Sequence, residues 1–274
     1  MADYLRIVPG ARLQTPIHRY VHPGTGRRVT VIGTVRIGEP DYYTSVRAVV
    51  DGLHAAGVVV QCEGSWSLPY DLGDADQRER RILADLADCR NLEQQRAAEL
   101  GWAGQGDALG SPAAWQVVDL TVLELLHRAG AVAAEDQVWR MRRQLDWPYD
   151  DPGGMDRLRL TMALTWRVMA CTWTMLGYVR AEPGALLLLG DRTRVALDGL
   201  DSTGRDTVLV RAALHLPGLH AGLTARGFVR TGEPQWLTVA RVPSIFATIG
   251  RLTAGRIRRA LRRGVSGDRD LYPL

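Results

Sequence analysis

Three side chains that can bind or move a proton stand just after apolar segments typical of buried strands. Arg36 follows "VTVIGTV" (29–35), Glu63 follows "VVVQC" (58–62) and His215 follows "TVLVRAAL" (207–214). Ligands of open α/β sheets bind at the carboxyl ends of the strands, so we expect these side chains to meet in one cleft. A carboxylate can act as a general base, an imidazole as an acid or base, and a guanidinium can hold a carboxylate or a developing oxyanion.

The elements that must position these side chains begin with a hairpin over residues 17–35, turned by the Gly- and Pro-containing residues 23–26. The apolar spacing within 39–57 predicts a helix that ends at Gly57, and 58–64 read as a short buried strand. Together these form a βαβ unit. Strands are expected again at "ALLLLG" (185–190), within 206–219 and at "PQWLTVA" (234–240).

The middle of the chain has 3.6-residue apolar periodicity over 76–102 and 119–130, and nothing between 70 and 180 indicates a strand. The step from Gly33 to Arg36 matches the step from Ala212 to His215, which suggests two related halves. We therefore predict one α/β domain over 1–274 with a central mixed sheet formed from both halves. Residues 1–70 form the N-terminal half of the sheet, 71–180 a helical insertion, and 181–274 the C-terminal half with a basic terminal helix.

The remaining histidines carry weaker signals. His18 and His22 lie four apart in the hairpin, and on a strand this spacing favours surface positions at an edge over a shared metal. His220 is expected outside the cleft, at the start of the helix that follows His215.

The segments around the three candidate residues resemble the Tiki superfamily, which includes TraB/GumN, ChaN-like and erythromycin esterase-like proteins. "GTVRIGEPDYY" is similar to its first G-x-x-H motif but has arginine for the histidine, "VVVQCEG" supplies the glutamate, and "AALHLPGL" resembles the second G-x-x-H motif. "LLLLGDRTRVALDGL" (186–200) resembles a further segment of the family, and the middle resembles the TraB/GumN insertion. The motifs and their surroundings add these candidate ligand-binding residues: Gly33, Thr34, Tyr42, Tyr43, Asp191, Arg192 and Gly218.

The resemblance implies an α/β core of two related halves, and family members include metal-dependent peptidases, metal-free esterases and haem-binding proteins. Arginine has no lone pair for a metal and would repel a dication, so the usual two-histidine site cannot form. A reduced site of Glu63, His215 and Asp191 for manganese, cobalt or zinc is left open. A second interpretation is metal-free chemistry. A third, with no chemistry, is an Arg36–Glu63 ion pair that remains from a lost site.

We therefore expect a hydrolase-type enzyme for a peptide, ester or other small carbonyl substrate. It is expected to be metal-free, because arginine replaces the first motif histidine. Glu63 would be the general base, His215 an acid, base or orienting residue, and Arg36 an electrophilic anchor. The alternative is a non-catalytic protein of the same fold that binds a small anion or haem.

Composition and charge bear on the binding partners and the cellular compartment of the protein. All 34 basic residues are arginine, which fits coding bias better than nucleic-acid binding, although 251–264 carries six arginines that could contact an anionic surface. On a helix there, Ile245, Ile249 and Leu252 would face inward. The apolar segment 160–179 holds Arg167 and reads as a buried helix and not a membrane span. Three scattered cysteines and no signal-like amino end indicate the cytoplasm.

Overall fold

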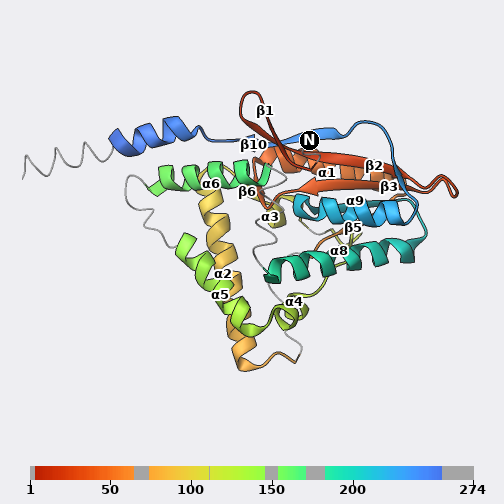
Figure 1. The fold of residues 1–274 in the computed structure, drawn as a ribbon, viewed down its shortest axis with the longest axis horizontal. Coiled ribbons are helices and arrows are strands. Elements are labelled where there is room, and N and C mark those ends of the chain that lie inside the picture. The colour runs from red at the N-terminus through yellow and green to blue at the C-terminus, as the bar shows by residue number, and fades with distance from the viewer. Residues whose placement is uncertain (1–3, 65–73, 111, 146–153, 171–182, 255–274) are drawn as a thin grey trace, which may run out of the picture.

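The computed structural model describes residues 4–64, 74–110, 112–145, 154–170 and 183–254 of the 274-residue chain. These residues form an α/β fold around a central mixed sheet, as the sequence predicts (Figure 1). The strands of its main path run in the order β1, β2, β3, β8, β5 and β7, and β9 and β10 pair with β2. Their bounds are Arg6–Val8 (β1), Arg12–Val21 (β2), Arg28–Thr34 (β3), Val59–Cys62 (β5), Gln116–Val117 (β7), Thr207–Ala212 (β8), Val229–Arg230 (β9) and Gln235–Arg241 (β10).

The sheet has an antiparallel part and a parallel part. The predicted hairpin is confirmed: β2 and β3 pair antiparallel with Ile17 opposite Ile32, and β10 pairs antiparallel with the other edge of β2. β8 pairs parallel with β3 on one side and with β5 on the other, and β7 extends the parallel part. A strand from the C-terminal part of the chain thus lies between two strands from the N-terminal part.

Helix α1 (Pro40–Ala55) and β5 form the predicted βαβ unit with β3. Proline near the start of α1 has the fixed φ that a first helical turn needs. The helix ends just before Gly57, whose φ of 82° lies in the left-handed region that glycine adopts without steric cost.

Two layers of helix cover opposite faces of the sheet. Gly33 and its strand partner on β8, Arg211, lie on one face, where a Cβ at Gly33 would come 2.7 Å from Leu216 at the start of α9 (Leu216–Ala225). The side chains next to Gly33 on β3 point to the opposite face of the sheet. Thr15 of β2 also points to this face, where its hydroxyl hydrogen-bonds Tyr42 of α1. Helix α8 (Pro183–Thr203) packs with α9, and Gln61 of β5 donates to the Gly199 carbonyl of α8 at 2.9 Å.

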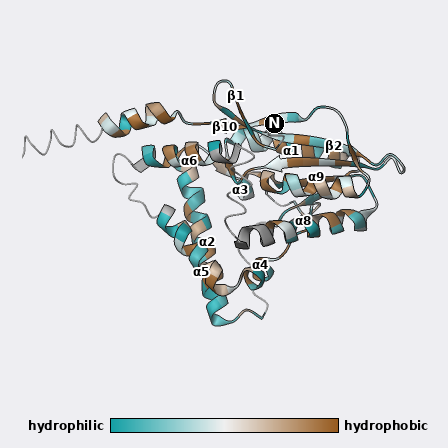
Figure 2. Cartoon of the chain, in the orientation of Figure 1, coloured by the Kyte–Doolittle hydropathy of each residue, from teal (hydrophilic) through white to brown (hydrophobic). Residues whose placement is uncertain are grey.

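The middle of the chain is helical, and Figure 2 shows teal and brown alternating along α2 and α5, as amphipathic helices should. Capping boxes at Asp76–Glu79 and Thr121–Glu124 satisfy the first amides of α2 and α4. A second apolar cluster, with Leu83 and Val138 among its members, joins α2, α4 and α5. The helices are α2 (Gln77–Glu99), α3 (Gln105–Leu109), α4 (Val122–Ala129), α5 (Ala131–Leu145) and α6 (Gly154–Ala170).

The expectation that no strand lies between 70 and 180 is wrong. β7 joins the main sheet through β5, and β6 (Ala103–Gly104) pairs antiparallel with β4 (Ile37–Gly38). Each of these strands is only two residues long, too short for a periodic pattern.

The prediction of a strand at 185–190 is also wrong, because these residues belong to the helix α8. The segment is rich in leucine and alanine, which favour helix, and contains no β-branched residue. The strand expected within 206–219 is β8, and it ends at Ala212 in a short 3₁₀ turn, Ala213–His215, that leads into α9.

The structure changes the positions expected for two histidines outside the candidate site. His18 is 1% exposed on the α9 face of the sheet, so the surface position predicted for it is wrong. His220 lies within α9 and not at its start, and its Nδ1 hydrogen-bonds the Tyr20 hydroxyl at 3.1 Å.

The two segments considered for membrane contact are only partly described. In α6, Ala163 and Trp166 are buried but Leu164 is 47% exposed, and residues 171–179 lie outside the described residues. Residues 245–254 are helical, and Ile249, expected to face inward, is 47% exposed. Over the parts of the chain that the structure describes, no helix has the length and apolar character to cross a membrane.

Candidate functional site

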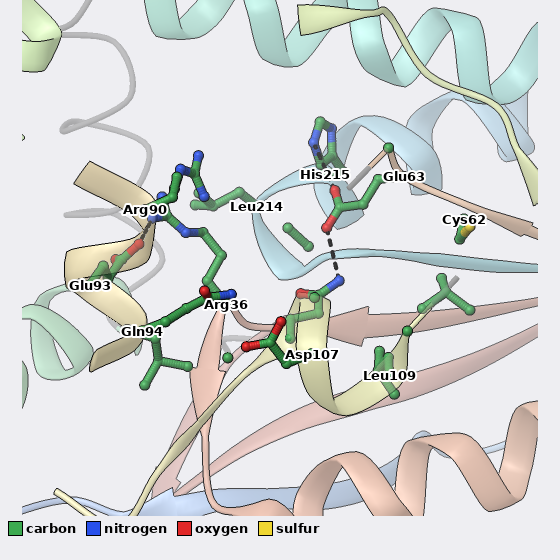
Figure 3. A pocket seen from close by; sticks show the side chains of 18 of the residues that line it. Arg36, Cys62, Glu63, Arg90, Glu93, Gln94, Asp107, Leu109, Leu214 and His215 are labelled. Carbon is green, nitrogen blue, oxygen red and sulfur yellow. Dashed lines mark hydrogen bonds and ion pairs between the residues drawn. The ribbon is translucent and has the colours of Figure 1, made fainter. Parts of the chain in front are cut away.

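A cavity of about 470 Å³ lies at the carboxyl ends of β3, β5 and β8, where the sequence predicts a cleft (Figure 3). Arg36, Glu63 and His215 all line it, two, one and three residues after their strands. Helices α2, α3 and α8 complete the wall. The parallel pairing of the three strands brings these distant residues together, as the βαβ pattern predicts.

Glu63 is held by two donors. Its Oε1 accepts a hydrogen bond from Nε2 of Gln105 at 3.2 Å, and its Oε2 lies 3.4 Å from Nη2 of Arg192. The side chain is 12% exposed, so the carboxylate remains partly accessible from the cavity. Figure 3 shows Glu63 and His215 pointing toward each other.

His215 is 2% exposed and uncharged near neutral pH. Burial, helped by the positive charges of Arg192 and Arg211, lowers the pKa of His215 to about 3. Its Nδ1 lies 3.0 Å from Oγ1 of Thr193. Its Nε2 lies 3.9 Å from Oε2 of Glu63 and has no hydrogen-bond partner among the described residues.

A buried cluster of charges stands behind these two residues. Asp119 is almost fully buried and accepts two hydrogen bonds from Arg192, at 2.9 and 2.6 Å, and one from the Gly64 amide at 2.9 Å. Burial by itself would raise the pKa of Asp119, but the bonds from Arg192 and the charge of Arg211 lower it overall. Arg211 is 0% exposed, lies 3.5 Å from Asp119 and donates to the Val118 carbonyl.

The four charges of this cluster, on Glu63, Asp119, Arg192 and Arg211, sum to zero. Each buried charge therefore has a partner of opposite sign, which ionised groups need when they are removed from water. The cluster fixes the guanidinium of Arg192 beside Glu63, so the cation next to the predicted base comes from α8.

Arg36 has a different partner from the one expected. Its guanidinium pairs with Glu93 of α2, and its side chain is 45% exposed. Its backbone carbonyl accepts a hydrogen bond from the Gln105 amide at 2.8 Å, which fixes the start of β4 beside α3. The Arg36–Glu63 ion pair is not formed, because Glu63 is engaged by Arg192 and Gln105.

Cys62 also lines the cavity. Burial raises the pKa of Cys62 to about 11, and the nearby charge of Arg211 only partly opposes this shift. The thiol therefore stays protonated near neutral pH and is a poor nucleophile.

Two tyrosines proposed as ligand-binding residues brace the end of β3 from the α1 side. The buried Tyr42 donates to the Gly33 carbonyl at 3.1 Å, and the buried Tyr43 donates to the Val35 carbonyl at 2.9 Å. Neither lines the cavity. Burial raises the pKa of both hydroxyls, so both remain protonated donors.

The other proposed ligand-binding residues divide between the cavity and its surroundings. Arg192 lines the cavity, whereas Gly33, Thr34 and Gly218 do not. Gly33 packs against Leu216, and Gly218 lies against Thr193. Asp191 is also outside the cavity lining, with its carboxylate between Arg128, at 2.5 Å, and Arg194.

Sequence reasoning missed Asp119, Arg211, Gln105 and Thr193. Asp119 stands two residues after β7, the same relation to its strand that Arg36 has to β3, so a recognised strand would have pointed to it. Arg211 was visible as a charge inside an apolar strand, a pattern that calls for a buried partner.

The described residues do not fit a metal ion. Glu63 and His215 supply two donor atoms 3.9 Å apart, but Asp191 turns away and the Arg192 guanidinium lies 3.4 Å from Glu63. Among the residues in the described ranges, no group of three or more His, Cys, Asp or Glu side chains is arranged to hold a metal.

Comparisons with known proteins give no further assignment. No protein-family model, no curated protein and no solved structure matches this chain.

Proposed function

We propose that this chain is a hydrolase-type enzyme that acts on a peptide, ester or other small carbonyl substrate without a metal, with Glu63 as the general base. One observation carries the proposal. The buried Nε2 of His215 has no hydrogen-bond partner among the described residues and lies 3.9 Å from Oε2 of Glu63 at the wall of a 470 Å³ cavity. A cavity of this size suits a small ligand.

Two acceptors so placed can bind one water molecule. The neutral imidazole offers a lone pair at Nε2 and the carboxylate offers another at Oε2, and a water has two protons to donate. An oxygen about 2.8 Å from each acceptor fits this separation. Such a water would direct its own lone pairs away from both acceptors, as a nucleophile must.

The chemical step then balances within these residues. Oxygen of the water forms a bond to the carbonyl carbon while Glu63 takes one of its protons, and Glu63 returns that proton to the leaving group as the carbon–leaving-group bond breaks. Arg192 is the cation nearest to this site. Its Nη1 has no acceptor in the described parts of the chain, which leaves N–H groups for the negative charge that develops on the carbonyl oxygen.

The arrangement also supports the proposed kinship with the Tiki superfamily, of the TraB/GumN-like kind. Glu63 and His215, which correspond to two of the family's motif residues, line one cavity. We propose Arg192 for the electrophilic role expected of Arg36, since Arg36 is paired with Glu93 and Arg192 with Glu63.

A second function is favoured by the contacts of Glu63 itself. Both carboxylate oxygens are engaged, by Gln105 and by Arg192, as they would be in an ion pair with a purely structural role. The alternative is therefore a non-catalytic protein of the same fold that binds a small anion or haem in this cavity.

We propose the cytoplasm as its compartment, because Cys62 and Cys89 are buried free thiols. A small molecule or peptide is the proposed ligand. The proposal includes neither nucleic acid nor a membrane as a partner. Contact of the 251–264 arginines with an anionic membrane surface is a weaker alternative.

The test compares Glu63→Gln with a matched variant, Glu93→Gln, which removes another carboxylate from the same cavity. A panel of p-nitrophenyl esters and short peptides is assayed with chelator and with added manganese, cobalt or zinc. We expect Glu63→Gln to lower turnover by about 100-fold or more, and the Glu93 variant to stay within a few-fold of the parent. Chelator should leave the parent rate unchanged.

Turnover that survives Glu63→Gln would remove Glu63 from the mechanism. If the panel shows no turnover, the same panel and haem are used as ligands in thermal unfolding. Stabilisation that is equal in the parent and in Glu63→Gln would favour the binding protein.

A further inference from the structure

The hydroxyl of Thr193 has only one proton, and that proton is committed. Thr193 lies on α8, and its Oγ1 donates to the Leu189 carbonyl, four residues earlier, at 2.7 Å. The same oxygen lies 3.0 Å from Nδ1 of His215. Since the hydroxyl already donates to Leu189, it can only accept from the imidazole.

This contact decides which nitrogen of His215 carries the proton. A neutral imidazole has one N–H and one lone pair, and the hydrogen bond of one nitrogen fixes the state of the other. If Nδ1 donates to Thr193, then Nε2 has no proton and presents its lone pair to Glu63. The orphaned state of Nε2 among the described residues agrees with this arrangement.

Gly218 keeps the threonine in this orientation. A Cβ at residue 218 would lie 3.1 Å from Cγ2 of Thr193, so the absence of a side chain lets α9 come close to the threonine methyl. The next turn repeats the contact, with a Cβ at Gly222 only 2.2 Å from Cδ1 of Leu197. The methyl of Thr193 packs against α9, and its hydroxyl faces the imidazole.

From these contacts we infer that Thr193 is a positioning residue that holds His215 as the Nδ1–H tautomer, so that Nε2 accepts from the attacking water. The inference rests on the proposed function for the role of that water, but the tautomer itself does not. In the opposite tautomer, Nε2 would carry the proton and point it toward Glu63, 3.9 Å away, so it could not accept a hydrogen bond from the attacking water. Arg192 and Thr193, neighbours on α8, thus serve Glu63 and His215 respectively.

The experiment measures the tautomer directly by ¹⁵N NMR of the full chain labelled at its six histidines, near neutral pH. His215→Asn identifies the His215 signals. In the parent we expect the proton on Nδ1 and a bare Nε2. Thr193→Val keeps the shape of the side chain but removes the hydroxyl acceptor. The Leu189 carbonyl remains near the imidazole, so we expect Nε2–H to gain population relative to the parent. Thr193→Ser keeps the hydroxyl and should match the parent.

Thr224→Val is the matched control, because Thr224 also donates to a carbonyl four residues earlier, at 2.9 Å, but on the exposed side of α9. It should leave the spectrum of His215 unchanged. With any substrate found for the enzyme, Thr193→Val should lower kcat by roughly 10- to 100-fold with little change in KM, and Thr193→Ser should recover most of the loss.

A proton on Nε2 in the parent overturns the inference even if Thr193→Val fails to fold. So does an unchanged tautomer in a folded Thr193→Val protein. If the tautomer responds as expected but no substrate is turned over, Thr193 keeps its positioning role and the hydrolase proposal fails. If a substrate is turned over but the tautomer of His215 does not respond to Thr193→Val, the hydrolase proposal stands and the positioning role of Thr193 fails.

Discussion

The buried imidazole of His215 should make the protein lose stability in mild acid. Burial lowers the pKa of His215 from 6.5 to about 3 in the folded state. Between these two values the unfolded chain holds a proton that the folded chain does not. The stabilising contribution of the neutral imidazole is therefore complete above pH 6.5 and is lost as the pH falls toward 3.

The size of the effect follows from the two pKa values. When the unfolded state binds one more proton than the folded state, the unfolding free energy falls by about 1.4 kcal/mol for each unit by which the pH is lowered. From pH 7 to pH 4.5, integration over the 6.5 and about 3 pKa values gives a loss of about 2–3 kcal/mol. His215→Asn has no group that titrates in this range, so it should remove this component whatever its effect at pH 7.

The assay is urea unfolding at half-unit steps from pH 4.5 to 7.5, with the parent and His215→Asn compared at each pH. Other titrating groups, including Asp119, contribute to both curves, so the difference between the curves reports His215. His54→Asn replaces an exposed imidazole of α1 and controls for the loss of a histidine as such. Parallel curves for the parent and His215→Asn would show that the imidazole is not held neutral, and the reasoning about its lone pair would fail with it.

Four further substitutions test the packing and the charges around the site and in α1 by urea unfolding at pH 7. Asp119→Asn leaves two buried arginines without their carboxylate and should lower the unfolding free energy by about 3–5 kcal/mol; a loss under 1 kcal/mol would contradict the buried cluster. Arg36→Gln breaks an ion pair in which the arginine is 45% exposed, and we expect a change below about 1 kcal/mol. Gly222→Ala should destabilise the protein by about 1–3 kcal/mol because its Cβ would clash with Leu197, whereas Gly52→Ala, with no atom near the new Cβ, should stabilise α1 by up to about 1 kcal/mol. Equal effects of the two glycine substitutions would argue against close packing of α8 on α9.

The βαβ unit was predictable because its signals are local. Runs of β-branched residues in 29–35 and 58–60 mark buried strands, and Gly57 marks the end of the helix between them. Once the strands are parallel, their carboxyl ends share one edge of the sheet. The placement of Arg36, Glu63 and His215 around one cavity follows from these signals without any knowledge of side-chain contacts.

The partners of these residues were not predictable in the same way. Arg36 meets Glu93, 57 residues away, because of the angle at which α2 crosses the end of the sheet, and no local pattern encodes that angle. β7 is too short to show alternation and exists through its pairing with β5. Asp119, which follows it, therefore gave no sign of being at the same edge as Glu63.

The error at 185–190 had the largest consequence for the site. The Tiki-like segment 186–200 suggested Asp191 as a metal ligand, and a strand over 185–190 would have placed it at a carboxyl end of the sheet. In a helix successive side chains turn by about 100°, so residues 191, 192 and 193 point in three directions. Asp191 turns to Arg128, Arg192 to Glu63 and Asp119, and Thr193 to His215. The change from strand to helix therefore removes a carboxylate from the site and brings in a guanidinium and a hydroxyl, which is why we propose metal-free chemistry there.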